Sequence, residues 1–365
     1  MLIHLVAGAR PNFMKIAPLF REARKHPSLD CRIVHTGQHY DFEMSQSFFN
    51  DLELPRPDFF LDAGSGSHAE QTGKIMLAYE QVCDQERPDW VVVVGDVNST
   101  LACSITAKKA CIKVAHVEAG LRSFDLTMPE EVNRMVTDSI SDFFFVTEQS
   151  GQENLLNEGK APERVHLVGH VMIDNLLHQV DLLEKADTSA LATSKVKPQG
   201  DYAFLTLHRP SNVDDKETLQ GILRALGIIS QDMPVLFAVH PRTRKQLDLF
   251  DFNLPGGVIQ LPPLGFREAL YLWKDARVVL TDSGGLQEET TALKIPCVTI
   301  RENTERPITI ELGSNRLAGN REKDILAAYI SCLKDDPTRY KVPPLWDGRA
   351  AERSLKILMQ REYRS

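Results

Sequence analysis

The sequence predicts an α/β protein with two doubly wound domains, each a parallel sheet covered by helices. Its 365 residues exceed the size of a typical single hydrophobic core. Short apolar, β-branched runs alternate with amphipathic helix patterns, which is the rhythm of βαβ units. This rhythm pauses once near the middle of the chain and then restarts. The pause predicts two domains rather than one.

The first half is expected to contain five strands, at residues 2–7, 31–35, 90–95, 113–117 and 143–146. The run WVVVV at 90–94 has no polar residue, as expected of a strand that is covered on both faces. A helix is predicted over 13–25, after the first strand. The pause follows Val168 and Gly169: a helix over 172–185 leads into residues 187–200, which are rich in Ser, Thr, Ala and Lys. We interpret that stretch as a linker.

The second half repeats the pattern, with strands expected at residues 202–207, 235–239, 258–260, 278–281 and 297–300. A last helix is predicted at about 349–362, and the pattern alone leaves it open which domain that helix joins. Two such domains predict a ligand cleft at the carboxyl ends of both sheets. The chemically informative residues should therefore follow the strands.

Composition excludes several classes of function. A content of 42% hydrophobic and 25% charged residues is ordinary for a soluble globular protein. No apolar run is long enough to span a bilayer, and no basic segment precedes the first one, so we expect a cytoplasmic protein that binds no membrane. The net charge of −8 argues against a nucleic-acid partner. The six cysteines form no CxxC pair, which predicts buried reduced thiols and no metal site.

Two cations follow the first strand, in the sequence GARPNFMK. Arg10 and Lys15 lie near the start of a helix, where backbone N–H groups and the helix dipole favour an anion. An ordinary strand-to-helix turn with solvated cations is the alternative. The turn is neither GxGxxG nor a Walker loop, so no dinucleotide cofactor is expected.

Three carboxylates follow later strands or begin a helix: Asp96, Glu118 and Glu130. We expect them to converge on one face of the cleft, where clustered carboxylates suit general acid–base catalysis. The alternatives are a helix cap after Asp96 and an acidic first turn at Glu130 and Glu131. Glu131 is expected to point elsewhere on its helix, so its replacement should be mild.

Anion-binding candidates also follow strands of the second half. His208 and Arg209 come first, although a histidine at a strand end is often only a capped surface residue. The sequence DSGGLQEE places Ser283, Gly284 and Gly285 at a helix start, as in a phosphate cradle. Glu289, one turn further along, is a candidate for binding two ribose hydroxyls.

Eight motifs occur in the order found in one family: GARPNFMK, TGQHYD, GDVNST, HVEAGLRSFD, PEEVNR, HRPSN, HPRT and DSGGLQEE. From residue 1 to about 317 the chain closely resembles the non-hydrolysing UDP-N-acetylglucosamine 2-epimerases. The resemblance implies the GT-B architecture, with two Rossmann-like domains facing across a cleft. It implies a first domain at 1–170, onto which a helix at about 349–365 packs back, and a UDP-binding domain at 171–348.

The resemblance also implies an activity: reversible epimerisation at C2 between UDP-N-acetylglucosamine and UDP-N-acetylmannosamine, for surface polysaccharide synthesis. The family eliminates UDP to form 2-acetamidoglucal and then adds it back, without a cofactor. By motif, the expected catalytic residues are Asp96, Glu118, Glu130 and His208. The expected substrate-binding residues are Arg10, Lys15, Arg134, Arg209, Asn212, Leu264, Phe266, Ser283, Gly284, Gly285 and Glu289, with Leu264 and Phe266 in a loop beside the uracil.

The family further implies a homodimer, and it makes Gln38, His39 and Arg242 candidates for a second, allosteric UDP-N-acetylglucosamine site. Four alternatives stay open at this stage. The chain can be an epimerase of a related 2,3-diacetamido or 6-deoxy UDP-sugar, a hydrolysing epimerase, a glycosyltransferase of the same fold, or an inactive nucleotide-sugar sensor. Retention of all three carboxylates speaks against the last two.

Overall fold

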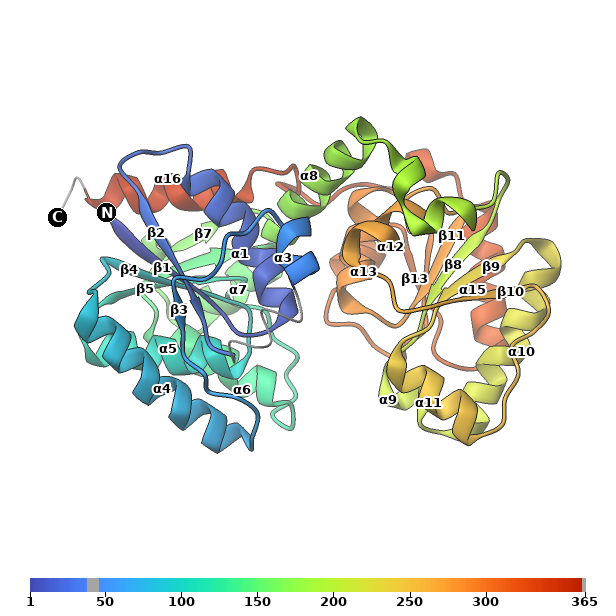
Figure 1. Cartoon of the computed structure of the whole chain (residues 1–365), viewed down its shortest axis with the longest axis horizontal. Coiled ribbons are helices and arrows are strands. Elements are labelled where there is room, and N and C mark those ends of the chain that lie inside the picture. Colours follow the sequence, from blue (N-terminus) through green and yellow to red (C-terminus); the bar gives the residue numbers. More distant parts are fainter. Residues whose placement is uncertain (38–45, 363–365) are drawn as a thin grey trace. The chain divides into compact units, whose positions relative to one another are not determined.

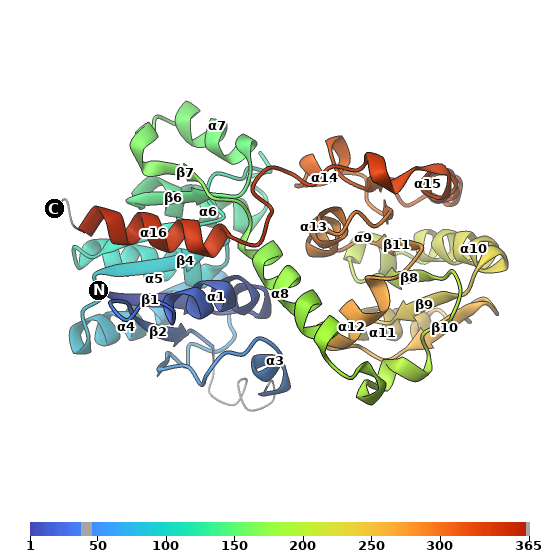
Figure 2. The same ribbon diagram turned by 90° about the horizontal axis from the view of Figure 1, so that it is seen from above.

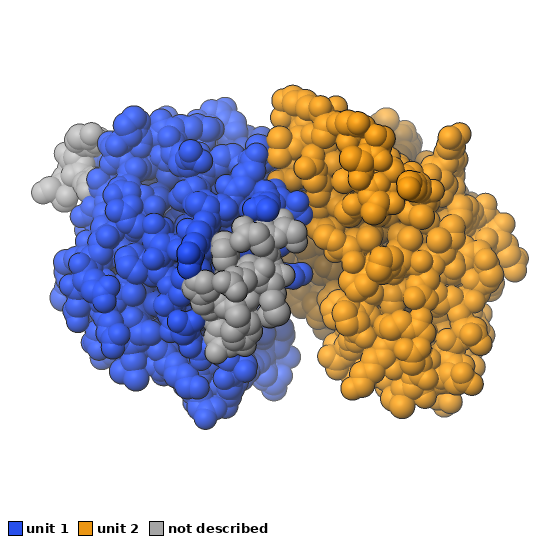
Figure 3. Space-filling model, in the orientation of Figure 1, with its two compact units in different colours: residues 1–178, 344–365 blue, residues 179–343 orange. Residues whose placement is uncertain are grey.

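The computed structural model of the protein describes residues 1–37 and 46–362 (Figure 1). The chain forms two compact units, which Figure 3 distinguishes by colour. Unit 1 comprises Met1–His178 and Pro344–Ser365, and unit 2 comprises Gln179–Pro343. The sequence placed the boundary at residue 170, but the division falls inside helix α8 (Val171–Lys185). The reason is that the start of α8 packs into the unit 1 core through Val171.

Unit 1 contains a seven-stranded parallel sheet with the order β3-β2-β1-β4-β5-β6-β7. Its strands are β1 (Leu2–Ala7), β2 (Asp30–His35), β3 (Phe59–Phe60), β4 (Trp90–Val94), β5 (Lys113–Val117), β6 (Phe143–Val146) and β7 (Val165–Leu167). All five predicted strands are present. The two that sequence analysis missed, β3 and β7, are the short edge strands, which have no long apolar run to reveal them.

Helices cover both faces of this sheet, because successive strand residues point to opposite sides. Ile3 and Leu5 of β1 pack in one core with helices α1 (Arg10–Ala23) and α16 (Ala350–Glu362). Val6 of the same strand packs in a second core with α4 (His68–Gln85) and α5 (Asn98–Lys109). Helix α16 lies beside α1 (Figure 2), so the C-terminal segment belongs to unit 1. The remaining helices are α3 (Gln46–Asp51), α6 (Pro129–Ile140), α7 (Gln149–Asn157) and the 3-10 turn η1 (Pro162–Arg164).

Unit 2 contains a six-stranded parallel sheet with the order β10-β9-β8-β11-β12-β13. Its strands are β8 (Ala203–Thr206), β9 (Val235–Ala238), β10 (Val258–Leu261), β11 (Val278–Thr281), β12 (Cys297–Thr299) and β13 (Asn315–Leu317). Only the edge strand β13 was not predicted. The helices are α9 (Pro210–Val213), α10 (Lys216–Asp232), α11 (Pro241–Leu249), α12 (Phe266–Trp273), α13 (Gly284–Ala292), α14 (Ile308–Glu311), α15 (Glu322–Lys334) and the 3-10 turn η4 (Pro337–Arg339).

The stretch interpreted as a linker is instead a docked part of unit 2. It forms two 3-10 turns, η2 (Thr188–Ala190) and η3 (Ala192–Lys195). The carboxylate of Glu268 on α12 accepts N–H groups from Ala192 and Thr193 at 3.0 and 3.1 Å. Lys197 donates to the carbonyl oxygen of Tyr271 at 3.0 Å. Polar composition suggested a free linker, whereas these tertiary hydrogen bonds order the segment.

Each sheet reverses its direction of winding once. In unit 1 the reversal lies between β1 and β4, and in unit 2 it lies between β8 and β11. Ligands of doubly wound folds bind at the carboxyl ends of the strands at this point. All six cysteines lie in the described residues as free thiols, and four are buried, although Cys111 is exposed. No helix among residues 1–37 and 46–362 is long and apolar enough to cross a membrane.

Candidate active site

The first turn of α1 is joined to the end of β4 by the buried Asn12. Its side-chain oxygen accepts N–H groups from Gly8 at 3.3 Å and Ala9 at 3.1 Å, and its amide donates to the carbonyl of Val94 at 3.2 Å. These bonds place the β1–α1 turn beside the strand end that precedes Asp96. Arg10 is exposed in this turn, with its guanidinium 5.5 Å from the ring centre of Phe48.

Glu118 is the most deeply buried of the three predicted carboxylates, with 1% of its surface exposed. It pairs with Lys15 of α1 through a salt bridge. Arg134 of α6 places one guanidinium nitrogen 3.4 Å from Glu118 Oε1 and 2.6 Å from Asp96 Oδ2. Two predicted carboxylates and two predicted cations therefore form one network. The cations offset the repulsion between the two acids.

Asp96 is further held by its backbone. Asn133, one residue before Arg134, donates to the carbonyl oxygen of Asp96 at 2.9 Å and to the side chain of Asn98 at 3.2 Å. Sequence analysis did not select Asn133 as a site residue, although it lies in the motif PEEVNR. Its position in that motif was the available signal.

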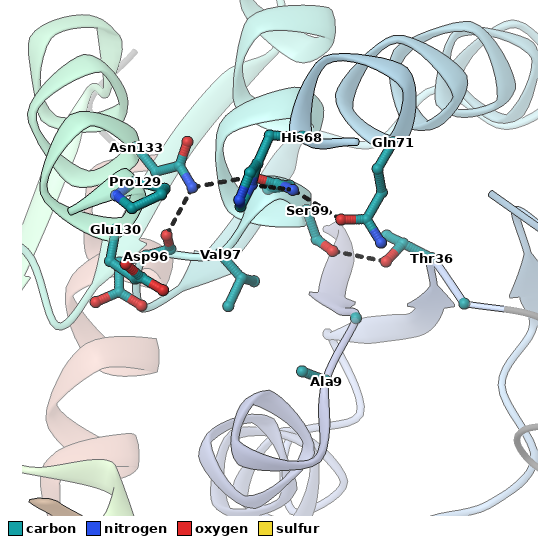
Figure 4. A pocket seen from close by; sticks show the side chains of 13 residues that line it. Ala9, Thr36, His68, Gln71, Asp96, Val97, Ser99, Pro129, Glu130 and Asn133 are labelled. Carbon is teal, nitrogen blue, oxygen red and sulfur yellow. Dashed lines mark hydrogen bonds between the residues drawn. The ribbon is translucent and has the colours of Figure 1, made fainter. Parts of the chain in front are cut away.

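A pocket opens beside this network at the switch point of the unit 1 sheet (Figure 4). Figure 4 shows Asp96 and Glu130 on one side of it, and Gln71 and Thr36 on the other. The lining residues are Gly8, Ala9, Thr36, Gly37, His68, Gln71, Asp96, Val97, Asn98, Ser99, Pro129, Glu130 and Asn133. Among these, none is Lys or Arg. His68 and Gln71 were not among the predicted residues, because the first turn of α4 has no distinctive motif.

The neutral part of the pocket wall is a hydrogen-bonded set of amides and hydroxyls. Asn98 donates to the side-chain oxygen of Gln71 at 2.7 Å. The hydroxyls of Thr36 and Ser99 lie 2.6 Å apart. Because these groups both donate and accept, the wall suits a ligand with hydroxyl and amide substituents.

The adjacent acids Glu130 and Glu131 at the start of α6 have different environments. Glu130 is exposed and lines the pocket. Glu131 is 2% exposed, and its carboxylate accepts backbone N–H groups from Ser123 at 2.8 Å and Phe124 at 3.1 Å. As expected, Glu131 points away from the pocket, but it also anchors the loop that follows β5, which the sequence did not predict.

In unit 2, the buried Asp282 gathers three predicted residues. Its carboxylate accepts the backbone N–H groups of His208 at 2.9 Å and Arg209 at 2.8 Å, and the side-chain amide of Asn212 at 3.2 Å. Burial alone would raise the pKa of Asp282, but the hydrogen bond and charge of His208 and the two N–H groups outweigh it, so that the pKa lies below its ordinary value. Asp282 was not among the predicted site residues, although it begins the motif DSGG.

The same aspartate orients the imidazole of His208. Nδ1 of His208 lies 2.8 Å from Oδ1 of Asp282. The ionised carboxylate can only accept, so Nδ1 carries a proton, and Nε2 is the nitrogen that can exchange one. The side chain of His208 is 40% exposed, which leaves it accessible to a ligand.

Helix α13 begins at the predicted phosphate cradle. Ser283 is its N-cap, with its hydroxyl accepting the N–H of Leu286 at 3.5 Å. A Cβ added at Gly284 or Gly285 would meet nothing within 4 Å among the described residues. Internal packing therefore does not require these two glycines. Their open side suits the close approach of an anion to backbone N–H groups.

Glu289 lies on α13 one turn beyond the cradle and is 6% exposed. Burial, and secondarily the charge of Glu288, raise the pKa of Glu289 to about 8. Glu288 itself pairs with Arg306. The two adjacent acids therefore differ in how their charge is compensated, because only Glu288 has a cationic partner among the described residues.

The remaining predicted residues are more dispersed. Nε of Arg209 donates to the carbonyl oxygen of Asp282 at 3.1 Å, next to the cradle. Leu264 and Phe266 are half-buried at the start of α12. Arg242 of α11 is bound to the carboxylate of Asp214, with Nε 3.0 Å from Oδ1. The candidates Gln38 and His39 lie outside the described residues. Within the described ranges, no three His, Cys, Asp or Glu side chains are grouped as metal ligands.

Comparison with known proteins places this geometry in context. The family model described as UDP-N-acetylglucosamine 2-epimerase matches residues 21–359. The UDP-N-acetylglucosamine 2-epimerase of Methanocaldococcus jannaschii is 43% identical over 370 residues, covering 100% of both chains. A crystal structure of the enzyme from that organism, with UDP-GlcNAc and UDP, has a TM-score of 0.87 and 41% identity, covering 99% of this chain and 100% of the other.

A relative that is named for a different substrate has a similar sequence identity. The UDP-2,3-diacetamido-2,3-dideoxy-D-glucuronate 2-epimerase of Pseudomonas aeruginosa is 40% identical over 323 residues, covering 87% of this chain and 88% of its own. Fold and comparisons together define a nucleotide-sugar epimerase of the GT-B-like α/β class. The chain belongs to the UDP-N-acetylglucosamine 2-epimerase family.

Proposed function

We propose that this protein interconverts UDP-N-acetylglucosamine and UDP-N-acetylmannosamine without hydrolysing them. The observation that carries the proposal is the network of Asp96, Glu118, Lys15 and Arg134 beside a pocket that Glu130 also lines. It supplies several carboxylates for moving a proton, held by fixed cations. A pocket wall of neutral amides and hydroxyls suits the sugar ring and its acetamido group.

The proposed reaction is an elimination followed by an addition. A carboxylate takes the proton from C2, the C–H electron pair forms the C1=C2 double bond, and the C1–O bond breaks to release UDP. UDP then adds back to C1 while a proton returns to the opposite face of C2. C2–H is weakly acidic because no carbonyl adjoins it, so stabilising the departing diphosphate is the larger task. Two faces of C2 require either two acid–base groups or a glycal intermediate that moves.

Unit 2 is proposed to bind the nucleotide. The N-terminus of α13 at Ser283, Gly284 and Gly285 is the candidate for the diphosphate, and Glu289 for the ribose hydroxyls. His208, oriented by Asp282, is the candidate to donate a hydrogen bond or proton to the leaving phosphate. Such an interaction strengthens as negative charge develops, so it favours the transition state over the bound substrate.

The related diacetamido-glucuronate is the second candidate substrate, because a relative that is 40% identical is named for it. Its uronate carboxyl group would enter a pocket that Asp96 and Glu130 line, and the described lining includes no Lys or Arg. Arg134 offsets the charge of Asp96, so the repulsion that disfavours this carboxyl group comes from Glu130. The neutral N-acetylhexosamine meets no such repulsion and is therefore the favoured substrate.

The test is incubation of the purified protein with UDP-N-acetylglucosamine in D2O, followed by NMR. The expected result is UDP-N-acetylmannosamine with deuterium at C2. Release of UDP and free N-acetylmannosamine would indicate the hydrolysing alternative. Conversion of only the diacetamido-glucuronate would reassign the substrate. Epimerisation without any deuterium at C2 would contradict elimination and addition through exchangeable groups.

A further inference from the structure

One buried cluster of unit 1 has no role in the chemistry proposed so far. His116 lies on β5, two residues before Glu118, and is completely buried. Its Nδ1 is 2.7 Å from Oδ1 of Asp138 on α6, and its Nε2 is 2.7 Å from the carbonyl oxygen of Gly95. Gly95 directly precedes Asp96. The imidazole therefore connects β5, the end of β4 and helix α6.

The partners of this imidazole determine where its protons lie. The carbonyl of Gly95 can only accept a hydrogen bond, so Nε2 must donate. The other oxygen of Asp138 is bound by the N–H of Gly120 at 3.1 Å and by Arg122 at 2.8 Å. Burial alone would raise the pKa of Asp138, but His116 and Arg122 outweigh it, and the pKa stays below its ordinary value. An ionised Asp138 also accepts, so Nδ1 of His116 donates as well.

This pair is attached to the backbone next to the half-buried Asp96 and the buried Glu118. Gly95 adjoins Asp96, and Gly120 follows Glu118 by two residues. Gly95, Glu118 and Gly120 adopt φ angles of 68, 67 and 79°. The left-handed conformation costs free energy for a side-chain-bearing residue such as Glu118; its own N–H is bound to the carbonyl of Phe145, and the N–H of Gly120, two residues on, is bound to Asp138.

The pair is also attached to the helix that carries the cation. Asp138 lies four residues, about one helical turn, after Arg134, whose guanidinium contacts Asp96 and Glu118. A displacement of α6 relative to β5 would therefore move Arg134 away from the two acids. It would also move Glu130, at the start of the same helix.

We propose that His116, with both ring nitrogens protonated and paired with Asp138, is the positioning residue that holds Asp96, Glu118 and α6 in catalytic register. The kinetic consequence of this inference rests on the proposed epimerase function. The protonation state of His116 does not, because it follows from the hydrogen bonds of the ring. His116 touches no pocket-lining side chain in the hydrogen bonds described above; it acts through the backbone of Gly95 and through Asp138.

The kinetic test uses His116→Asn and Asp138→Asn, with His4→Asn as the matched control. His4 is equally buried in the same sheet, on β1, and its Nδ1 pairs with the hydroxyl of Tyr79 at 3.1 Å. Burial, with a smaller contribution from Arg32, lowers the pKa of His4 to about 4, so its ring is neutral. Both His116→Asn and Asp138→Asn should lower kcat by about 10- to 100-fold with little change in KM, the scale of a misplaced catalytic group. His4→Asn should lower Tm but not kcat.

The spectroscopic test uses the wild-type protein with ¹⁵N-labelled histidine, and the His116 ring signals are assigned by through-bond correlation to the backbone of His116, so no variant is needed for the assignment. At pH 7 both ring nitrogens of His116 should be protonated, whereas His4 should have one bare nitrogen. In Asp138→Asn, His116 should become neutral. A neutral His116 in the wild-type protein would overturn the inference, and this measurement decides even if a variant fails to fold.

The two proposals fail in different ways. A wild-type protein without epimerase activity contradicts the proposed function, and the NMR measurement then still tests the charged pair. An active wild-type protein in which His116→Asn loses no more kcat than His4→Asn contradicts the positioning role alone. A parallel rise in KM would also contradict it, because that result would indicate a defect in substrate binding.

Discussion

At the scale of single residues, neighbouring acids in this protein have opposite tasks because their surroundings differ. Glu130 is exposed in the pocket, while Glu131 is buried and bound to backbone N–H groups. Glu288 pairs with Arg306, while burial raises the pKa of Glu289. Residue type alone therefore does not assign a role. The partner of each carboxylate does.

Replacement of the three candidate acids tests the proton transfers. Asp96→Asn, Glu118→Gln and Glu130→Gln keep the shape of each side chain but remove the base, so each should lower kcat by about 10² to 10⁴. At least one should release free 2-acetamidoglucal and UDP, because elimination would persist after the return step is damaged. NMR of the reaction mixture measures both. Glu80→Gln, an exposed acid of α4, is the control and should keep full activity.

The raised pKa of Glu289 predicts pH-dependent nucleotide binding. Two ribose hydroxyls would donate to an ionised carboxylate, so binding should release a proton below the pKa of about 8. The affinity for UDP-N-acetylglucosamine should then rise by up to about tenfold per pH unit between pH 6 and 8. Calorimetry in buffers of different ionisation enthalpy measures the proton. Glu289→Gln should bind more weakly and without this slope; an unchanged slope would exclude the ribose role.

The raised pKa of Glu289 also determines how the stability of the folded protein changes with pH. The pKa of Glu289 is raised in the folded protein from its ordinary value of 4.5. Its contribution to stability is therefore fully present below pH 4.5 and is lost as the pH rises towards 8. In the absence of ligand, Glu289→Gln should reduce the loss of thermal stability across that interval. An identical pH profile in the variant and the wild-type protein would contradict the buried, protonated state.

At the scale of elements, the site is formed by the loops after strands and by the first turns of helices. The loop after β5 returns to α6, where Glu131 anchors it through the N–H groups of Ser123 and Phe124. The same helix then presents Asn133 and Arg134 to Asp96. One helix thus organises the acids of two strand ends.

Glu130→Gln and Glu131→Gln should separate chemistry from folding at this helix. Glu131→Gln turns a buried acceptor into a partial donor facing two partly buried N–H groups, which should cost about 1–3 kcal/mol of stability. That corresponds to a fall in Tm of about 2–4 °C per kcal/mol for a unit of this size, measured by calorimetry. Glu130→Gln should leave Tm unchanged and lower kcat. Equal Tm values for the two variants would contradict the anchoring role of Glu131.

At the scale of the whole molecule, unit 1 exposes a set of apolar side chains around α6. Phe124 and Leu126 in the preceding loop are 81% and 69% exposed, and Val132, Met135 and Val136 share a face of the helix. Val132, Met135 and Val136 are neighbours on the helix surface, which suits an interface better than scattered apolar residues do. We propose that this α6 surface forms the homodimer that the family resemblance implies.

Introducing charge on the α6 surface tests the homodimer. Met135→Glu and Val136→Glu should convert a dimer to a monomer in sedimentation experiments, because an apolar contact cannot bury an unpaired carboxylate. Leu249→Glu in unit 2, at a leucine that is 68% exposed, is the control and should stay dimeric. A wild-type protein that sediments as a monomer would contradict the proposal.

The two parallel sheets and most of the candidate site follow from patterns along the chain. Long apolar runs such as 90–94 must be buried on both faces, and polar motifs after such runs must lie at the carboxyl ends of the strands. Asp96, Glu118 and Lys15 were selected on this basis and Arg134 through its motif, and the four lie together. The sequence pattern is sufficient to predict these strands and the residues after them, because an apolar run must be buried and the motif that follows it must lie at the end of that strand.

Features that depend on contacts between distant segments are visible only in the folded protein. The edge strands β3, β7 and β13 are too short for a pattern, and residues 187–200 are ordered by hydrogen bonds to α12. Three contacts join residues that are separated along the chain: Glu131 with Ser123, His208 with Asp282, and His116 with Asp138. Local sequence cannot encode such partners, because whether a polar group is buried and bound depends on what the fold brings to it.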